Sequence, residues 1–85
     1  MKTFAYTITD PEGIHARPAG ILVKQAAAFK STIKMSGNGK EADIKRLIAV
    51  MGMGIKKDME VVFTIEGEDE EEAAATLEKF MQDNL

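Results

Sequence analysis

Apolar side chains recur at every second position in several stretches of the chain, and this spacing limits the possible folds more than any other feature. In the two longest stretches, 3–9 and 57–67, the alternating apolar residues are Phe4, Tyr6, Ile8, Met59, Val61, Phe63 and Ile65. Each stretch therefore predicts a β-strand with only one apolar face. Strands of this kind favour an antiparallel sheet that is covered by helices on one side.

A second pair of strands is predicted at 32–36 and 42–44, on either side of the sequence Gly37-Asn38-Gly39. Ile33 and Met35 are the inward residues of the first of these strands. Asn and Gly both tolerate positive φ, which a tight hairpin turn requires. We therefore expect the two strands to form a hairpin.

Helical spacing of apolar residues appears in three other segments. The residues with this spacing are Ala19, Leu22, Val23 and Ala26; then Leu47, Ile48, Val50 and Met51; and finally Ala73, Ala74, Leu77, Phe80 and Met81. In the first segment Lys24 and Gln25 are expected to face away from the core. The acidic run 68–72 is interpreted as the solvated start of the last helix, where negative charge is favourable. The predicted order is βαββαβα, an α+β open-faced sandwich.

Length and composition exclude several classes of function. A chain of 85 residues is expected to form one domain, spanning 1–85. Its formal net charge of -3 is too acidic for a dedicated nucleic-acid binder. The absence of cysteine excludes disulfides, thiol catalysis and cysteine-based zinc sites. The longest uncharged apolar run, 47–55, is far too short to cross a membrane, so we expect no membrane insertion and a cytoplasmic location.

The only histidine stands in the sequence GIHARPAG, residues 13–20. A lone histidine between a loop and a helix is often an ordinary surface residue. A metal site is disfavoured because one imidazole lacks partners, and we expect neither a metal nor a cofactor. A hydrolase is disfavoured as well, since no recognisable nucleophile motif accompanies the imidazole.

The position of the histidine favours a more specific function. Pro18 fits only the first turn of a helix, where its missing N–H is not needed. His15 then precedes a helix N-terminus, whose free N–H groups and dipole favour an anion. Arg17 adds a planar guanidinium that can bind two phosphate oxygens. The segment is therefore interpreted as a nucleophile beside a phosphate-binding site, able to accept a phosphoryl group and pass it on.

The run Gly13-Ile14-His15-Ala16-Arg17-Pro18-Ala19 resembles the active-site signature of the HPr family, the histidine-containing phosphocarriers of the bacterial phosphoenolpyruvate-dependent phosphotransferase system. The resemblance extends over essentially the whole chain. It implies a four-stranded antiparallel sheet with three helices on one face. It also implies that His15 accepts a phosphoryl group on Nδ1 from phosphorylated Enzyme I and passes it to a sugar-specific IIA domain. Arg17 would neutralise the phosphoryl group, and the N–H groups of Ala16 and Arg17 would bind it. We expect a monomer.

The short second helix predicts a surface for partner proteins. Leu47, Ile48 and Met51 could all belong to the core, but so short a helix cannot bury every apolar side chain. Exposed apolar residues near a charged site suggest a docking surface, and methionine suits one that fits several partners. The resemblance implies docking of Enzyme I and of IIA domains here. The expected docking residues are Gly20, Lys24, Arg46, Leu47, Ile48 and Met51.

One position departs from many family members. A serine that precedes the short helix is phosphorylated by a regulatory kinase in those members, and Arg46 stands at the matching position here. Arginine has no hydroxyl group, so regulation by that route is in doubt. Two alternatives to a sugar-system carrier stay open: a nitrogen-regulatory or other specialised paralogue, and a binding module that keeps the fold without phosphoryl transfer. His15 argues against the binding module.

Overall fold

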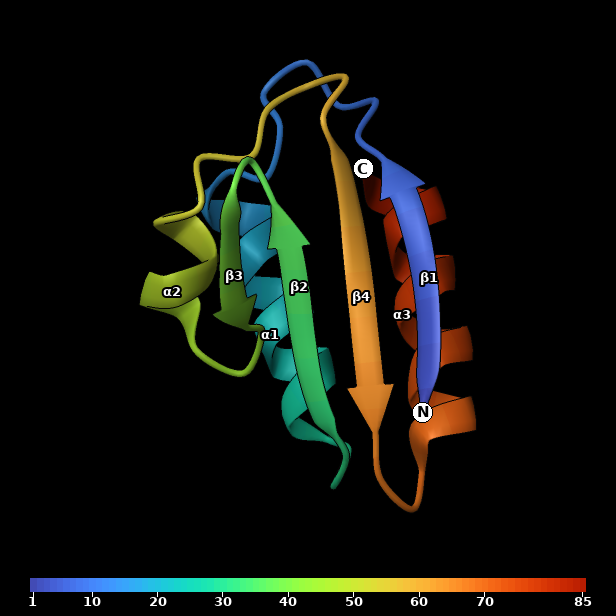
Figure 1. Cartoon of the computed structure of the whole chain (residues 1–85). Helices are drawn as coiled ribbons and strands as arrows, with labels where there is room; N and C mark the ends of the chain where they lie inside the picture. The colour runs from blue at the N-terminus through green and yellow to red at the C-terminus, as the bar shows by residue number, and fades with distance from the viewer.

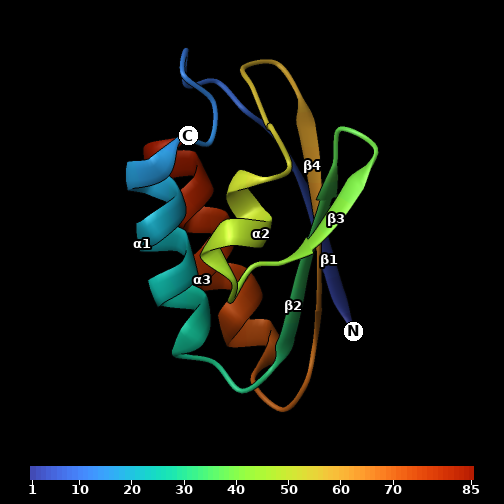
Figure 2. The same ribbon diagram turned by 90° about the vertical axis from the view of Figure 1, so that its left-hand side faces the viewer.

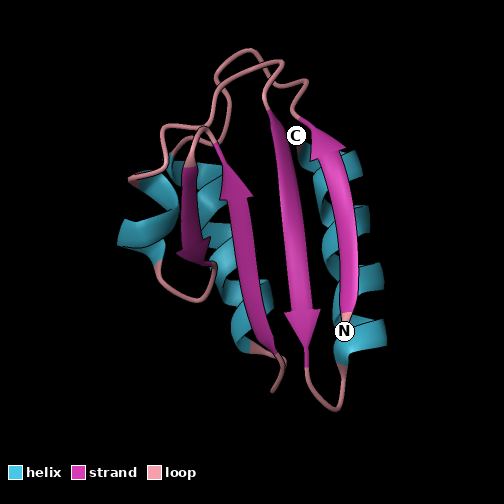
Figure 3. Ribbon diagram, in the orientation of Figure 1, coloured by secondary structure: helices cyan, strands magenta, loops and turns pink.

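The computed structural model describes residues 1–85 and contains one four-stranded sheet and three helices (Figures 1 and 3). The strands are β1 (Lys2–Thr7), β2 (Thr32–Gly37), β3 (Lys40–Asp43) and β4 (Glu60–Glu66). The helices are α1 (Ala16–Ala27), α2 (Leu47–Met51) and α3 (Glu70–Asn84). The predicted order βαββαβα is confirmed.

The sheet has the strand order β1-β4-β2-β3, and all neighbouring strands are antiparallel. The last strand of the chain, β4, therefore lies between β1 and β2. All three helices lie on one face of the sheet, while the other face is open (Figure 2). The predicted open-faced sandwich is confirmed.

The core lies between the covered face of the sheet and the helices. Ile33, Met35, Val61, Phe63 and Ile65 point into it, and none of them is exposed. The alternating apolar residues of β2 and β4 thus occupy the side that the sequence predicts. Burial of side chains of this size stabilises a fold by about 1.5–3 kcal/mol each.

The hairpin between β2 and β3 has the predicted tight turn. Asn38 and Gly39 have φ angles of 52° and 71°, and Gly37 pairs with Lys40 across the turn. The Asn38 side chain also donates a hydrogen bond of 2.9 Å to the carbonyl of Met53. The turn therefore holds the segment that follows α2 as well as joining two strands.

Strand β4 begins later than the alternation predicts. The sequence predicts a start at 57, but the strand starts at Glu60 because Asp58 has a φ of 71°, which breaks the extended backbone. Asp58 still donates a backbone hydrogen bond of 2.8 Å to Ile8, and Ile8 donates one of 2.9 Å to Met59. The irregular turn is thus tied to the end of β1.

The prediction that Gln25 faces away from the core is wrong. The residue is half-buried, and its side-chain oxygen is buried without a hydrogen-bond partner. It lies beside residues of α3, among them Thr76 and Phe80, in a hollow that they line together. The side of α1 that carries Gln25 is therefore partly covered by α3, which the periodicity of α1 alone does not indicate.

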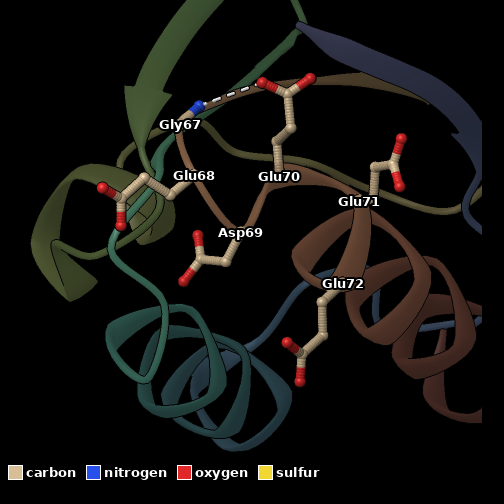
Figure 4. A pocket seen from close by; sticks show the side chains of 6 residues that line it. All are labelled: Gly67, Glu68, Asp69, Glu70, Glu71 and Glu72. Atoms are coloured by element: carbon tan, nitrogen blue, oxygen red, sulfur yellow. Dashed lines mark hydrogen bonds between the residues drawn. The ribbon is translucent and has the colours of Figure 1, made fainter.

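The acidic run before α3 is more than a solvated helix start. The Asp69 carboxylate accepts backbone hydrogen bonds from Lys30 at 2.8 Å and from Ser31 at 3.0 Å, and a short one from the Ser31 hydroxyl. These bonds, with the Ser31 hydroxyl first, lower the pKa of Asp69 below 3.8. In Figure 4, Glu70 reaches back to the Gly67 N–H. The N-terminal amine and then the Gly67 N–H lower the pKa of Glu70.

None of the three helices is long and apolar enough to span a bilayer.

We predict that Asp69→Asn lowers stability, because an amide has only one acceptor oxygen for three donors. The pKa of Asp69 is lower in the folded chain than its ordinary value of 3.8. The ionised Asp69 carboxylate therefore stabilises the folded chain fully above about pH 5, and this stabilisation is lost as the pH falls through the folded-state pKa of Asp69. Urea unfolding should give a lower midpoint for the variant at about pH 7 and a smaller difference at about pH 3.

The matched control for this measurement is Glu72→Gln, which removes one negative charge from an exposed side chain of the same helix turn. Equal unfolding midpoints for the two variants at neutral pH would contradict the structural role of Asp69.

Candidate functional site

His15 stands at the junction of a loop and α1, at the end of the molecule where the 8–15 and 52–59 loops meet (Figure 1). Its backbone is extended, with φ -92° and ψ -179°, and helical geometry begins at Ala16. Pro18 is the third residue of the helix and is buried. The prediction that Pro18 belongs to the first turn and that His15 precedes it is confirmed.

The first turn of α1 leaves its positive end without a partner from the chain. The first intrahelical hydrogen bond runs from Ala19 to the carbonyl of His15, at 3.0 Å. The N–H groups of Ala16 and Arg17 donate to no other group in the chain. The His15 side chain makes no capping bond, and the turn contains no acidic residue. Arg17 is exposed and forms no salt bridge. Two N–H groups and a guanidinium are therefore free to bind an anion.

Two carboxylates face the imidazole, and the sequence-based analysis missed them. The Nε2 atom of His15 lies 3.4 Å from Oε2 of Glu12 and 3.9 Å from Oδ2 of Asp10. The His15 side chain is 36% exposed, so the ring is partly accessible to solvent. The sequence contains a signal for this contact, because Glu12 precedes His15 by three residues.

The loop that carries these residues has a fixed path. Gly13 has a φ of 68° and is buried. A β-carbon at this position would lie 2.3 Å from the carbonyl oxygen of Ile55. The next residue, Ile14, donates a backbone hydrogen bond of 3.1 Å to that same oxygen. Glycine is thus required here by both its conformation and its lack of a side chain.

A shallow pocket of about 180 Å³ lies at the site and is lined by Asp10, His15, Arg17, Pro18, Ile21 and Asn84. Sequence analysis missed Ile21 and Asn84; Ile21 is 44% exposed although it is apolar and helical. A larger hollow of about 530 Å³ lies over the acidic turn 67–72, at the opposite end of the molecule (Figures 1 and 4). One glycine and five acidic residues line it, and no imidazole is among them. We therefore assign the candidate site to the smaller pocket, which contains His15.

The predicted docking residues lie on α1 and α2, which are side by side on the covered face of the sheet (Figures 1 and 2). On α2, Leu47 is 40%, Ile48 85% and Met51 42% exposed. The expectation that apolar residues of this helix stay exposed is therefore confirmed; the one buried residue of α2 is Val50.

The charged and small residues of the predicted surface are also accessible. Lys24 and Arg46 are exposed. Gly20 is half-buried, and a β-carbon there would meet no atom within 4 Å. The neighbouring Lys45 is instead half-buried and donates a 2.8 Å hydrogen bond from Nζ to the carbonyl of Phe29. Lys45 thus holds the loop after α1 rather than standing free.

A cation could be held only by the imidazole and its two carboxylates. One ligand atom each from Asp10, Glu12 and His15 lies within 4.8 Å of the others. The imidazole thus has two carboxylates beside it as possible further ligands, which the count of histidines and cysteines in the sequence does not indicate. Exposed carboxylates often lie this close together without a metal, and the same two carboxylates are ion-pair partners for a protonated ring.

Comparisons with known proteins agree with this geometry. The family model "PTS HPr component phosphorylation site" matches residues 2–83. The phosphocarrier protein HPr of Mycoplasma genitalium is 42% identical over 85 residues, which cover 99% of this chain and 97% of the relative.

Among solved structures, the histidine-containing phosphocarrier protein of a mycoplasma matches with a TM-score of 0.94 and 36% identity, over 96% of this chain and 93% of that one. An HPr dimer from Thermoanaerobacter tengcongensis matches with a TM-score of 0.77 and 32% identity, over 98% of this chain and 95% of that one. The chain therefore belongs to the HPr family of phosphocarrier proteins of the phosphotransferase system.

Proposed function

We propose that this chain accepts a phosphoryl group on Nδ1 of His15 from phosphorylated Enzyme I and passes it to IIA domains of sugar permeases, in the cytoplasm. The observation that carries the proposal is the position of His15 directly before two free N–H groups and an unpaired guanidinium. These groups supply what a doubly charged phosphoryl group needs on arrival. Membership of the phosphocarrier family supports the same role.

The proposed step is a direct displacement at phosphorus. The lone pair of Nδ1 attacks, a P–N bond forms, and the bond between phosphorus and the donor atom breaks. The phosphoryl oxygens are then stabilised by the N–H groups of Ala16 and Arg17 and by the Arg17 guanidinium. Release to a IIA domain is the reverse of this reaction with a different acceptor.

The partly exposed ring suits a carrier better than a self-contained enzyme. His15 lies in a pocket of only about 180 Å³, and its side chain is 36% exposed. Enzymes that hydrolyse or transfer groups on small substrates usually surround them in larger clefts. A carrier must instead present one group to two different proteins in turn. An accessible imidazole on a rigid helix start meets that need.

The exposed side chains of α2 support a shared docking surface for those proteins. Ile48 is 85% exposed, and an apolar side chain in that state is stabilised by burial against a partner. Arg46 and Lys24 add positive charge that would speed the approach of acidic partners. Because Arg46 has no hydroxyl group, we expect no serine-kinase regulation at this position. We expect the chain to act as a monomer, although the relative from Thermoanaerobacter tengcongensis has been solved as a dimer.

The decisive test of the proposal is phosphorylation by Enzyme I. The protein is incubated with phosphoenolpyruvate, magnesium and Enzyme I, and its mass is then measured. We expect one added phosphate that is labile in acid and stable in base, as a phosphoramidate is. His15→Ala should take up none. Labelling that persists in His15→Ala, or a wild-type protein that stays unlabelled, would refute the proposal.

A second prediction concerns Arg17. If its guanidinium stabilises the transferring group, Arg17→Ala should slow phosphoryl transfer by about 10²-fold. The fold should be unchanged because the side chain is exposed and forms no salt bridge. Rapid-quench measurement of transfer from phosphorylated Enzyme I checks the rate, and Lys34→Ala, which removes one exposed positive charge from β2, serves as the control. Equal rates for both variants would show that Arg17 is only a surface charge.

A third prediction concerns docking. Met51→Glu and Ile48→Glu should each weaken binding to Enzyme I, because a charge would have to be buried at the contact. Both should leave the melting temperature nearly unchanged, since the side chains are 42% and 85% exposed. Isothermal titration calorimetry measures the affinity. The control is Ala75→Glu on the exposed side of α3. Unchanged affinity in both α2 variants, or a large fall in melting temperature, would contradict the proposed surface.

A further inference from the structure

Asp10 and Glu12 contact one nitrogen of the imidazole, and the proposed transfer uses the other. Nε2 lies 3.4 Å from a Glu12 oxygen and 3.9 Å from an Asp10 oxygen. Neither carboxylate forms any other salt bridge. Nδ1 is bonded to Cγ and is therefore the ring nitrogen nearer the backbone, and its lone pair points away from Nε2. The two edges of the ring thus have different electrostatic surroundings.

Hydrogen bonds hold the Asp10 carboxylate and the backbone of the turn that carries Glu12. The N–H of Glu12 donates to Oδ1 of Asp10 at 2.8 Å, which leaves the other oxygen of Asp10 facing the ring. The N–H of Asp10 donates to the carbonyl of Leu85 at 2.9 Å, and Gly13 donates to the carbonyl of Asp10 at 2.9 Å. The Asp10 carboxylate and the backbone beneath Glu12 are therefore arranged before any phosphoryl group arrives.

An ionised carboxylate accepts hydrogen bonds and cannot donate one, so a nitrogen that faces it is favoured in its N–H form. In a neutral imidazole only one nitrogen carries hydrogen, and the other carries the lone pair. We infer that Asp10 and Glu12 are positioning residues that hold the proton on Nε2 and thereby select Nδ1 as the phosphoryl acceptor. This inference rests on the proposed function and names residues that determine which nitrogen reacts.

The same contacts stabilise the ring during transfer. When Nδ1 forms its bond to phosphorus, the bond between phosphorus and the donor atom breaks, and its electron pair leaves with the donor. Nε2 keeps its proton, so the ring becomes positively charged. The carboxylates of Asp10 and Glu12 stabilise that charge through charge-assisted contacts. They also repel an incoming phosphoryl group from Nε2. When the group moves on to an acceptor, the ring returns to the neutral N–H form.

The first test needs no phosphoryl transfer. Long-range ¹H–¹⁵N correlation spectra at alkaline pH report which nitrogen of the neutral His15 ring carries hydrogen. We expect the Nε2–H form alone in the wild type, and an added Nδ1–H population in Asp10→Asn/Glu12→Gln. The Nδ1–H form as the main species in the wild type, or the same spectrum for both proteins, would overturn the inference.

The second test measures transfer itself. Asp10→Asn/Glu12→Gln should accept phosphate from Enzyme I about five- to tenfold more slowly, which is the loss expected when charge-assisted contacts become neutral ones. The control Glu72→Gln/Glu78→Gln removes two exposed charges on α3 and should keep the wild-type rate. ³¹P spectra of the labelled proteins identify the phosphorylated nitrogen. A double variant that matches the control in rate, with phosphate still only on Nδ1, would overturn the inference.

Two further variants test whether slower transfer in the double variant comes from the lost charges or from a disturbed fold. Glu12→Gln alone changes a side chain that is 73% exposed, so it leaves the Asp10 turn intact and should show a smaller effect of the same kind. Glu12→Asp keeps the charge and should keep most of the wild-type rate of phosphoryl transfer from Enzyme I. A wild-type protein that takes up no phosphate would count against the proposed function, while the nitrogen spectra would still decide the role of the carboxylates.

Discussion

Burial on a single face of the sheet determines where every functional group of this chain lies. At the centre of the sheet Ile33 pairs with Ile65, and Met35 pairs with Phe63; none of these side chains is exposed. Only helices cover that face, so α1, α2 and α3 must all pack on the same side. Placing α1 beside α2 in this layer brings the helix that begins after His15 next to the helix with the exposed apolar side chains. The proposed site and its docking surface are thus consequences of one packing constraint.

The starts of α1 and α3 show how the same element can be built for stability or left incomplete. At α3, Glu70 accepts a hydrogen bond from the Gly67 N–H, and two more glutamates follow in the first turn. At α1 there is no acid and no capping bond, and Arg17 adds positive charge to the positive end of the dipole. Such a placement costs an isolated helix about 0.3–1 kcal/mol. A bound phosphoryl group would remove this cost. The usual preference for negative charge at a helix start is therefore not met by the chain itself where the proposed function needs an anion to bind.

Much of the fold could be predicted because the interactions that specify it are local or periodic. The alternation in β4, the Asn38-Gly39 turn and the position of Pro18 each follow from the preferences of a few neighbouring residues. The later start of β4 could not be predicted, because the positive φ of Asp58 is set by the hydrogen bonds that tie this turn to β1. The hydrogen bonds that Asp69 accepts from Lys30 and Ser31 join residues 39 and 38 positions apart, and no local pattern predicts them.

The residues of the candidate site also differ in whether local sequence could predict them. His15, Arg17 and the free N–H groups could be predicted because they are adjacent in sequence and belong to one helix start. Glu12 could have been predicted from its spacing to His15, whereas Ile21 and Asn84 enter the pocket only because α1 and α3 pack together. The exposure of Ile48 followed from the shortness of α2, since a single helical turn cannot turn all its apolar side chains toward one core.

An incomplete site is the physical requirement for a carrier of the proposed kind. Transfer is fastest where water is excluded and every charge on the moving group is matched, but a chain that met both conditions alone would also retain the group. Here the chain provides one guanidinium, two N–H groups and an open pocket. The remaining walls must come from whichever partner covers the exposed apolar side chains of α2. In the proposed function, burial of the exposed Ile48 against a partner and closure over His15 would occur in the same contact, so transfer and docking would be coupled. Without a partner the ring is partly open to solvent, and a phosphoryl group on it would be held only by the bonds that the next acceptor would have to replace.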